Sequence, residues 1–306
     1  MTKSIDPHRI ALIGFGEVGL IFGKALVASG RHDVAAYDIL VDDRAAAGAL
    51  RRKAEDAGVA LKASAADAAR GARIVVSAVT AASARDVAQA AAGYLGAGQL
   101  FLDINSVSPE TKRANAADVE RSGARYVEAA VMAPVPPHGL KVPILLGGSA
   151  APEIVAILGP LGMKLDIAST VIGQASAIKM CRSLMIKGIE ALTIECLMTA
   201  RRYGVEDRIT ASLGQSFPNM DWEKLAGYMI GRAVQHGRRR AAEMRESASM
   251  IAGIGLDPLM ASATAAREDF AADCAVACPG LKELSDAQWR EALDLMLTQL
   301  QKDEAA

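Results

Sequence analysis

The sequence predicts an α/β protein, in which an N-terminal doubly wound parallel sheet is followed by an all-α C-terminal domain. Three observations predict this class. Short apolar runs alternate with helical patterns through the first half of the chain. From about Gly173 onward, the pattern is helical throughout. The length of 306 residues suits two domains of ordinary size.

The first half supplies strands with helices between them. An apolar run that stops at a glycine or a polar residue is typical of a buried strand. Helical patterns cover about 17–29 and 43–57, which stop at Gly30 and Gly58. Strand, helix and strand at this spacing form right-handed βαβ units and therefore a parallel sheet. The predicted strands are residues 9–14, 33–37, 73–79, 99–103, 124–131 and 142–147.

One long helical pattern opens the second half. It runs from Gln174 to Tyr203 without a proline and with Gly188 as its single interior glycine. At ~1.5 Å per residue it would span ~45 Å, which is longer than a typical domain is wide. We expect such a helix to link two domains or to carry a subunit interface. The sequence thus divides into residues 1–170 and an all-α domain of residues 171–306 for substrate binding and dimerisation.

The composition excludes several classes of protein. Lys and Arg number 34 and Asp and Glu 35, so the net charge of −1 leaves no basic footprint for nucleic acid. No run approaches the ~18 uncharged apolar residues of a membrane span, and the N-terminus lacks the apolar stretch of a secretory signal. We expect a cytoplasmic protein. The four cysteines form no C-x-x-C pair, so free thiols are expected rather than disulfides or a metal site.

A glycine-rich motif follows the first predicted strand and opens the next helix. Its residues are Gly14, Phe15, Gly16, Glu17, Val18 and Gly19, a G-x-G-x-x-G. In this context the first glycine permits a tight turn, the second lets a pyrophosphate approach the backbone, and the third lets the helix pack on the strand. The start of the helix offers N–H groups and a positive dipole end to the phosphates. Residues 1–170 are therefore interpreted as a dinucleotide-binding Rossmann domain.

The choice of cofactor depends on Asp38, which ends the second predicted strand about 20 residues after the motif. A carboxylate there accepts hydrogen bonds from the ribose hydroxyls and repels a 2′-phosphate. NAD is therefore expected in preference to NADP. Arg44, shortly afterwards in the chain, is either a solvated helix residue or a partner for a 2′-phosphate.

Three further motifs resemble those of the β-hydroxyacid dehydrogenases, which are relatives of 6-phosphogluconate dehydrogenase. Asp103–Pro109 (DINSVSP) resembles the family's D-x-S-[ST]-x-x-P. Tyr126–Val131 stands where the family has the strand before its Ser-Gly-Gly substrate loop, and Gly173–Lys179 resembles the segment with the catalytic lysine. The match extends over nearly the whole chain. It is closest to a bacterial subgroup of unassigned function, marked by Asn105-Ser106, a Met-Ala-Pro loop, Lys179-Met180 and His236–Arg240.

The resemblance implies that Lys179 is the catalytic general acid and base on the substrate oxygen. The residues themselves leave two interpretations, because a lysine in a mostly apolar helical stretch either extends to solvent or lies in a cleft. Partial burial would lower its pKa toward the working pH, which favours proton transfer. The hydride chemistry belongs to the nicotinamide.

The ends of two predicted strands supply further contacts. The resemblance places Ser106 at the nicotinamide or the substrate and Val79 and Thr80 over the cofactor. Ser106 follows a strand at the carboxyl edge of the sheet, where doubly wound folds bind ligands. The next helix is already capped by Ser108, so Asn105 and Ser106 are expected to bind ligands. The alternative for Val79 and Thr80 is a plain turn.

The chain departs from the family at its substrate-binding positions. Met132, with Ala133 and Pro134, replaces Ser-Gly-Gly, and Pro134 has no N–H to donate. Arg182 and Ser183 stand where the family usually has His or Asn followed by Asn. Arg182 would bind a carboxylate or lie on the surface. An arginine run replaces the family's C-terminal lysine, so His236 and Arg240 are expected at the substrate, whereas at least one of the three arginines is solvated.

These observations predict a cytoplasmic NAD-dependent oxidoreductase that acts on an alcohol, expected to be a β-hydroxyacid. The alternatives are an imine reductase, which shares the architecture but typically lacks this lysine, and a non-catalytic dinucleotide-binding sensor. The helix from Gln174 to Tyr203 carries apolar residues on more than one face, so it must be buried on several sides. We therefore expect a homodimer through the α-domain.

Overall fold

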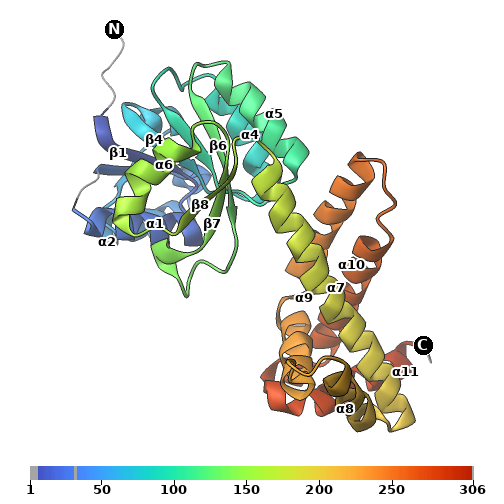
Figure 1. The fold of residues 1–306 in the computed structure, drawn as a ribbon. Helices are drawn as coiled ribbons and strands as arrows, with labels where there is room; N and C mark the ends of the chain where they lie inside the picture. Colours follow the sequence, from blue (N-terminus) through green and yellow to red (C-terminus); the bar gives the residue numbers. More distant parts are fainter. Residues whose placement is uncertain (1–5, 31–32, 305–306) are drawn as a thin grey trace. The chain divides into compact units, whose positions relative to one another are not determined.

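A computed structural model describes residues 6–30 and 33–304 (Figure 1). The chain forms two compact units that divide between Lys179 and Met180. The first is an α/β unit and the second is helical, so the predicted fold class is confirmed. Among the described residues, no helix is both long enough and apolar enough to cross a membrane.

The α/β unit contains one eight-stranded sheet in the order β3-β2-β1-β4-β5-β6-β7-β8. The strands are β1 (Asp6–Ile13), β2 (Asp33–Tyr37), β3 (Ala60–Leu61), β4 (Ala72–Ser77), β5 (Leu100–Asp103), β6 (Arg125–Val131), β7 (Ile144–Gly147) and β8 (Leu165–Ser169). The order reverses between β1 and β4, which places their carboxyl ends at the switch point where doubly wound sheets bind ligands.

One strand pair departs from the predicted parallel arrangement. Strands β1 to β6 are parallel, but β7 runs antiparallel to β6, with Val131 opposite Ile144. The chain between these strands contains only a short 3₁₀ turn, Gly139–Lys141, and no crossover helix. A parallel pair needs a long crossover connection, so the short return produces an antiparallel pair. Strand β8 is then parallel to β7.

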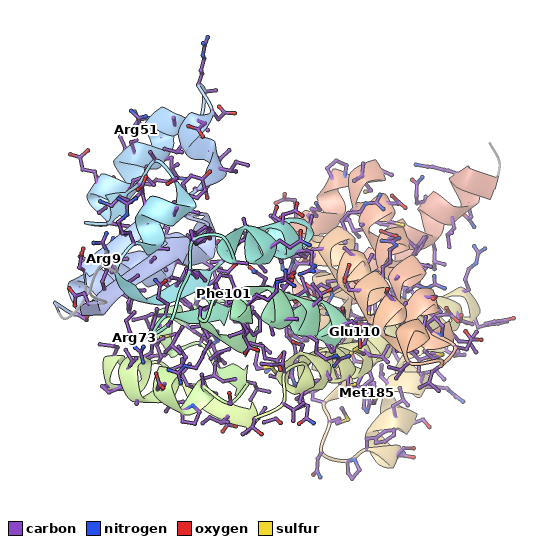
Figure 2. The ribbon with its side chains drawn as sticks, turned by 90° about the horizontal axis from the view of Figure 1, so that it is seen from above. Arg9, Arg51, Arg73, Phe101, Glu110 and Met185 are labelled. Atoms are coloured by element: carbon purple, nitrogen blue, oxygen red, sulfur yellow. The ribbon has the colours of Figure 1, made fainter. Side chains whose placement is uncertain are left out.

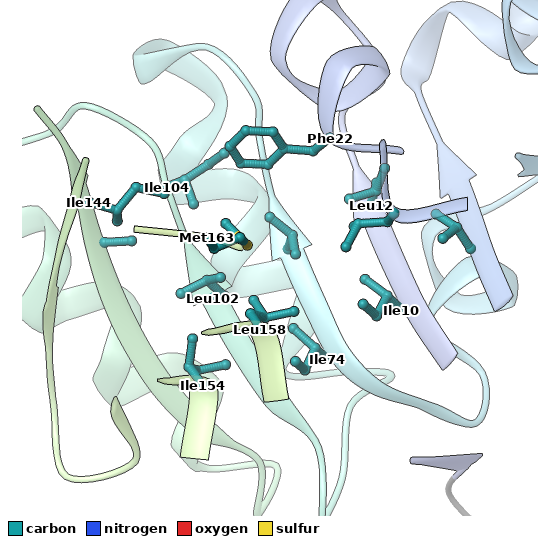
Figure 3. Packing of buried hydrophobic residues seen from close by; sticks show 14 of the residues in the cluster. Ile10, Leu12, Phe22, Ile74, Leu102, Ile104, Ile144, Ile154, Leu158 and Met163 are labelled. Carbon is teal, nitrogen blue, oxygen red and sulfur yellow. The ribbon is translucent and has the colours of Figure 1, made fainter. Parts of the chain in front are cut away.

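Helices cover both faces of this sheet. On one face lie α1 (Glu17–Ala28), α2 (Ala47–Asp56) and α6 (Ala151–Leu158); on the other lie α3 (Ala65–Ala69), α4 (Ala81–Ala91) and α5 (Pro109–Glu120). Figure 3 shows the hydrophobic core on the face covered by α1, α2 and α6. There, Phe22 of α1 and Ile154 and Leu158 of α6 pack on strand residues. Buried strands therefore read as nearly continuous apolar runs.

The start of α2 lies four residues beyond the sequence expectation. A 3₁₀ turn occupies Ile39–Asp42, and the Asp43 carboxylate then accepts hydrogen bonds from the N–H groups of Ala45 (2.8 Å) and Ala46 (2.9 Å). Such local side-chain bonds compete with helix formation. The helix begins only at Ala47.

Helix α7 (Gln174–Tyr203) begins in the first unit, and most of it belongs to the second. Its bounds are those that the sequence predicts. The second unit also contains α8 (Glu206–Ser216), α9 (Trp222–Gly253), α10 (Leu259–Ala277) and α11 (Trp289–Glu304), with short 3₁₀ turns at Pro279–Glu283 and Asp286–Gln288. Its core joins Ile194 and Leu197 of α7 to Ile230 of α9 and Leu293 of α11. Figure 2 labels Met185 on the part of α7 in this unit; its side chain is 63% exposed.

Candidate functional site

The glycine motif forms a tight turn between β1 and α1. Gly14 has φ +96°, and a Cβ there would collide with the Ala78 carbonyl. The Phe15 ring is 2% exposed and belongs to the core, so only the backbone of this residue is available to a ligand. Gly19 packs directly against the Gly14 carbonyl, where a Cβ would also collide. The first and third glycines are therefore required by packing.

Gly16 has the surroundings of a ligand-binding glycine. It is exposed, and a Cβ built on it would meet no atom within 4 Å. It is the N-cap of α1, and no side chain within residues 6–30 and 33–304 caps this helix start. Glu17 is exposed and Val18 is half-buried. Open space beside an uncapped helix start fits the pyrophosphate of a dinucleotide.

Asp38 joins the end of β2 to this turn. Its Oδ2 accepts a hydrogen bond from the Phe15 N–H at 2.7 Å, and its Oδ1 accepts one from the Leu40 N–H at 3.0 Å. Each carboxylate oxygen can accept a further bond, so Asp38 can hold the glycine turn and still receive ribose hydroxyls. Arg44 is exposed, beyond the 3₁₀ turn.

Asn105 connects the loops that follow β4 and β5. Its Oδ1 accepts a hydrogen bond from the Val79 N–H at 2.8 Å, and its Nδ2 donates to the Ser77 hydroxyl at 2.9 Å. The residue is only 5% exposed. The amide predicted to bind substrate thus also holds together two loops at the carboxyl edge. Thr80 is exposed, starts α4, and its hydroxyl lies 3.0 Å from that of Ser83.

Lys179 and Ser106 lie together, although 73 residues separate them in the chain. The Lys179 Nζ donates to the Ser106 Oγ at 3.0 Å. Ser106 is exposed and Lys179 is half-buried. An amine that can carry a proton therefore stands beside a hydroxyl, at the sheet edge that also carries the glycine turn. This arrangement can bind a substrate oxygen and exchange a proton with it.

A buried network supports the Ser106 loop from beneath. Asp103 ends β5, and its Oδ1 accepts bonds from the Lys112 ammonium (3.0 Å) and the Asn105 N–H (2.9 Å). Its Oδ2 accepts bonds from the Tyr126 hydroxyl (2.6 Å) and the Asn115 amide (3.1 Å). Burial alone would raise the pKa of Asp103, but Lys112 and these hydrogen bonds outweigh burial and lower it. Asp103 is therefore a buried carboxylate that anchors the loop.

Two parts of this support, Lys112 and Tyr126, are not predicted from the sequence. Lys112 is 1% exposed and also donates to the Asp103 carbonyl at 2.8 Å. A lysine side chain on a helix is normally exposed to solvent. The available signal was its position one turn into α5, on the same face as the buried Ala116 and Val119.

The remaining residues predicted to bind substrate are distributed over the two units, with Met132 in the α/β unit and the others in the helical unit. Met132 is half-buried after β6, and its N–H donates to the Pro143 carbonyl at 2.8 Å. In the helical unit, Arg182 is exposed and the Ser183 hydroxyl accepts a hydrogen bond from Lys187. His236 is exposed on α9, where partial burial and then Arg239 and Arg232 lower its pKa below the usual value.

Arg240 is enclosed by acidic side chains. It is 3% exposed, forms an ion pair with Glu190 of α7, and lies 3.2 Å from the Glu268 carboxylate of α10. Its neighbours in the run, Arg238 and Arg239, are exposed, as expected for a solvated face. Arg240 therefore joins three helices within its own unit.

Most of the chain is similar to known proteins. Residues 9–151 match the family described as the NAD binding domain of 6-phosphogluconate dehydrogenase, and residues 200–270 match a domain of unknown function. A conserved hypothetical protein from Sinorhizobium meliloti is 39% identical; the alignment covers 95% of this chain and 96% of that one, with a TM-score of 0.84.

A second solved structure links the chain to a named class of enzymes. It is a conserved protein of unknown function described as structurally similar to 3-hydroxyacid dehydrogenases. It is 31% identical, covers 87% of this chain and 97% of its own, and has a TM-score of 0.75.

More distant structures show the fold. A 3-hydroxyisobutyrate dehydrogenase from Mycobacterium tuberculosis is 19% identical over 94% of this chain and 99% of its own, with a TM-score of 0.72. An imine reductase from Bacillus cereus is 14% identical over 88% of this chain and 94% of its own, with a TM-score of 0.59. The chain belongs to the 6-phosphogluconate dehydrogenase-like family of β-hydroxyacid dehydrogenases, NAD(P)-dependent oxidoreductases, in a branch of unassigned function.

Proposed function

We propose that this protein is an NAD-dependent dehydrogenase that oxidises the hydroxyl group of a β-hydroxyacid, or reduces the matching carbonyl, with Lys179 as general acid and base. The observation that carries this proposal is the 3.0 Å hydrogen bond between the Lys179 Nζ and the Ser106 Oγ. Both residues belong to the α/β unit that contains the glycine turn.

In this proposal, Lys179 transfers the proton and Ser106 orients the reacting oxygen of the substrate. In the oxidation direction, a neutral Lys179 amine takes the hydroxyl proton while the C–H bond breaks. In the reduction direction, the ammonium returns that proton to the oxygen. Ser106 accepts a hydrogen bond from Lys179 and can donate its own hydrogen to the substrate oxygen. The hydride-accepting and hydride-donating chemistry is that of the nicotinamide, when it is bound.

The chain's own residues also favour one cofactor. Gly16 and the uncapped start of α1 would hold the pyrophosphate, and Asp38 would receive the ribose hydroxyls. The Asp38 carboxylate is held by two backbone N–H groups, so it cannot easily turn away from a 2′-phosphate. Repulsion between these two anions supports NAD.

The substrate class is tested by following the absorbance of reduced cofactor with a panel of β-hydroxyacids, the matching keto acids and cyclic imines. Turnover of a hydroxyacid or keto acid supports the proposal. Turnover of imines alone would identify an imine reductase, and binding of cofactor without any turnover would favour a sensor. Either of these two results contradicts the proposal.

A further inference from the structure

A buried carboxylate meets the first turn of α7. Glu128, in β6, is 0% exposed. Its Oε1 accepts hydrogen bonds from the N–H groups of Gly173 (2.6 Å) and Ala175 (3.1 Å). Its Oε2 accepts bonds from the N–H (3.4 Å) and the hydroxyl (2.6 Å) of Ser176. All of these donors belong to one short segment of the chain, so one carboxylate fixes the whole start of the helix.

These donors are mostly groups that an α-helix leaves without partners. The first N–H groups of a helix have no intrahelical acceptor, and a negative charge there also complements the helix dipole. Glu128 thus takes the place that an anion would otherwise occupy at the start of α7. The start of α1 is different, because no side chain of the described residues caps it. The fold closes one helix start with its own carboxylate and leaves the other open.

Glu128 also lies opposite Asp103 in the sheet. The two residues are partners in the register of β5 and β6. Asp103 holds the loop that carries Ser106, through its bond to the Asn105 N–H. Glu128 holds the helix that carries Lys179, which follows Ser176 by less than one turn of helix. The two ends of the Lys179–Ser106 hydrogen bond are therefore anchored at one pair of facing residues.

We propose that Glu128 is a positioning residue for proton transfer, which places Lys179 against Ser106 by fixing the start of α7. The proposal rests on the proposed function, in which Lys179 exchanges the proton. It goes further in assigning to a residue of the sheet interior a kinetic role rather than a role in stability alone. A purely structural role would lower the stability of the α/β unit and leave kcat of the folded enzyme unchanged.

The test compares four variants with the wild-type chain. Glu128→Gln keeps the shape but removes the charge and presents an NH₂ group to the N–H donors. Glu128→Asp keeps the charge on a shorter side chain. Ser176→Ala removes one donor, and Glu120→Gln makes the same charge change on the exposed end of α5. For each folded variant, kcat, KM and the dissociation constant of NAD are measured.

We expect Glu128→Gln to reduce kcat by ~10²-fold, because a displacement of ~1 Å at a reacting group costs about that much. Glu128→Asp should recover part of the loss and Ser176→Ala should lose less than Glu128→Gln. The dissociation constant of NAD should stay at the wild-type value in all of them, because the glycine turn is untouched. Glu120→Gln should match the wild-type chain.

A second measurement does not depend on turnover. The lysines are dimethylated with a ¹³C-labelled reagent, and the Lys179 signal is assigned by its loss in Lys179→Arg. Removing the Glu128 charge leaves the positive end of α7 unbalanced, so the pKa of the Lys179 amine should fall in Glu128→Gln. Glu120→Gln should leave the signal and its titration unchanged.

The two measurements separate the two proposals. If Lys179→Ala keeps full activity, the proposed function is wrong, while the NMR titration still reports whether Glu128 governs the lysine. Wild-type kcat together with a wild-type Lys179 titration in Glu128→Gln would overturn the positioning role. If Glu128→Gln does not fold, Ser176→Ala decides: a lower kcat supports the role, and an unchanged kcat and titration contradict it.

Discussion

The Lys112 ammonium lies 3.0 Å from the Asp103 carboxylate, and both side chains are 1% exposed. Removing one partner of a buried ion pair leaves the other charge buried without compensation, which costs about 3–5 kcal/mol. Lys112→Met should therefore lower the free energy of unfolding by about that amount at neutral pH. The double variant Asp103→Asn/Lys112→Met should lose less, and Lys24→Met, on the exposed face of α1, should lose little. Urea denaturation checks each value.

The same pair predicts a dependence on pH. The folded pKa of Asp103 lies below the usual 3.8, so the carboxylate stabilises the folded chain above that value and loses this contribution as the pH falls through the lowered folded pKa. Without Lys112 the folded pKa rises. Acid unfolding of Lys112→Met should therefore begin at a higher pH than that of the wild-type chain. Circular dichroism measures the pH midpoint of acid unfolding. The same midpoint in Lys112→Met and the wild-type chain would exclude the role of Lys112 in lowering the pKa of Asp103.

Asp38 makes a prediction about cofactor choice. NAD should bind more tightly than NADP, and Asp38→Ala should narrow the difference, because the repulsion of the 2′-phosphate is lost. The same change frees the Phe15 N–H, so NAD affinity should also fall. Asp42→Ala, an exposed neighbour, is the control. Fluorescence titration with both cofactors measures the ratio; tighter NADP binding to the wild-type chain would refute the assignment.

Arg240 is predicted to act on stability. Arg240→Ala should lower the free energy of unfolding of the helical unit by about 3–5 kcal/mol, because Glu190 and Glu268 stay buried. Arg239→Ala removes an exposed pair with Glu243 and should cost less than ~1 kcal/mol. Denaturation curves compare the two. If both variants have the same free energy of unfolding and only Arg240→Ala raises KM, the stabilising role is wrong and Arg240 binds the substrate.

We propose that the protein is a homodimer through its helical unit. Met185 and Leu192 are both 63% exposed and lie seven residues apart, on one face of α7. Light scattering should give twice the chain mass of 31.9 kDa. Leu192→Asp should shift the mass toward the monomer, whereas Val276→Asp, at a position of α10 that is 72% exposed, should not. A monomer mass for the wild-type chain at micromolar concentration would contradict the dimer.

Patterns of period and punctuation predicted much of the fold. The bounds of α7 follow from an unbroken helical period between Gly173 and Gly204, which adopt φ values of +99° and +68°. The start of α2 was displaced because the Asp43 side chain captured two N–H groups. The antiparallel β7 depends on a connection without a helix, a feature visible in the sequence only as a proline-rich loop.

The site divides in the same way. A motif predicts the glycine turn, because its chemistry is local to six residues. The family resemblance places Lys179 at the substrate and Ser106 at the nicotinamide or the substrate, but no local pattern predicts the hydrogen bond between them, since the partners are 73 residues apart. Arg238, Arg239 and Arg240 look alike in sequence, but each step along a helix rotates the side chain by ~100°, and only Arg240 turns inward. Buried partners such as Lys112 have no signature beyond their place on a helix face.

Substitution of Lys179 tests the account most directly. Lys179→Ala should reduce kcat by ~10²–10⁴-fold and leave NAD affinity unchanged, since general acid–base catalysis contributes about that much. Lys179→Arg should not restore activity, because a guanidinium does not release its proton at the working pH. Lys164→Ala, an exposed lysine of the same unit, is the control.

If Arg182 holds a substrate carboxylate, Arg182→Ala should instead raise KM more than it lowers kcat.

The deciding measurement is kcat of Lys179→Ala with the substrate that the panel identifies, compared with Lys164→Ala under the same conditions. A loss of at least ~10²-fold that is confined to Lys179→Ala is the predicted result. Near-wild-type turnover by Lys179→Ala would contradict the central claim, because the proton would then be exchanged by another group.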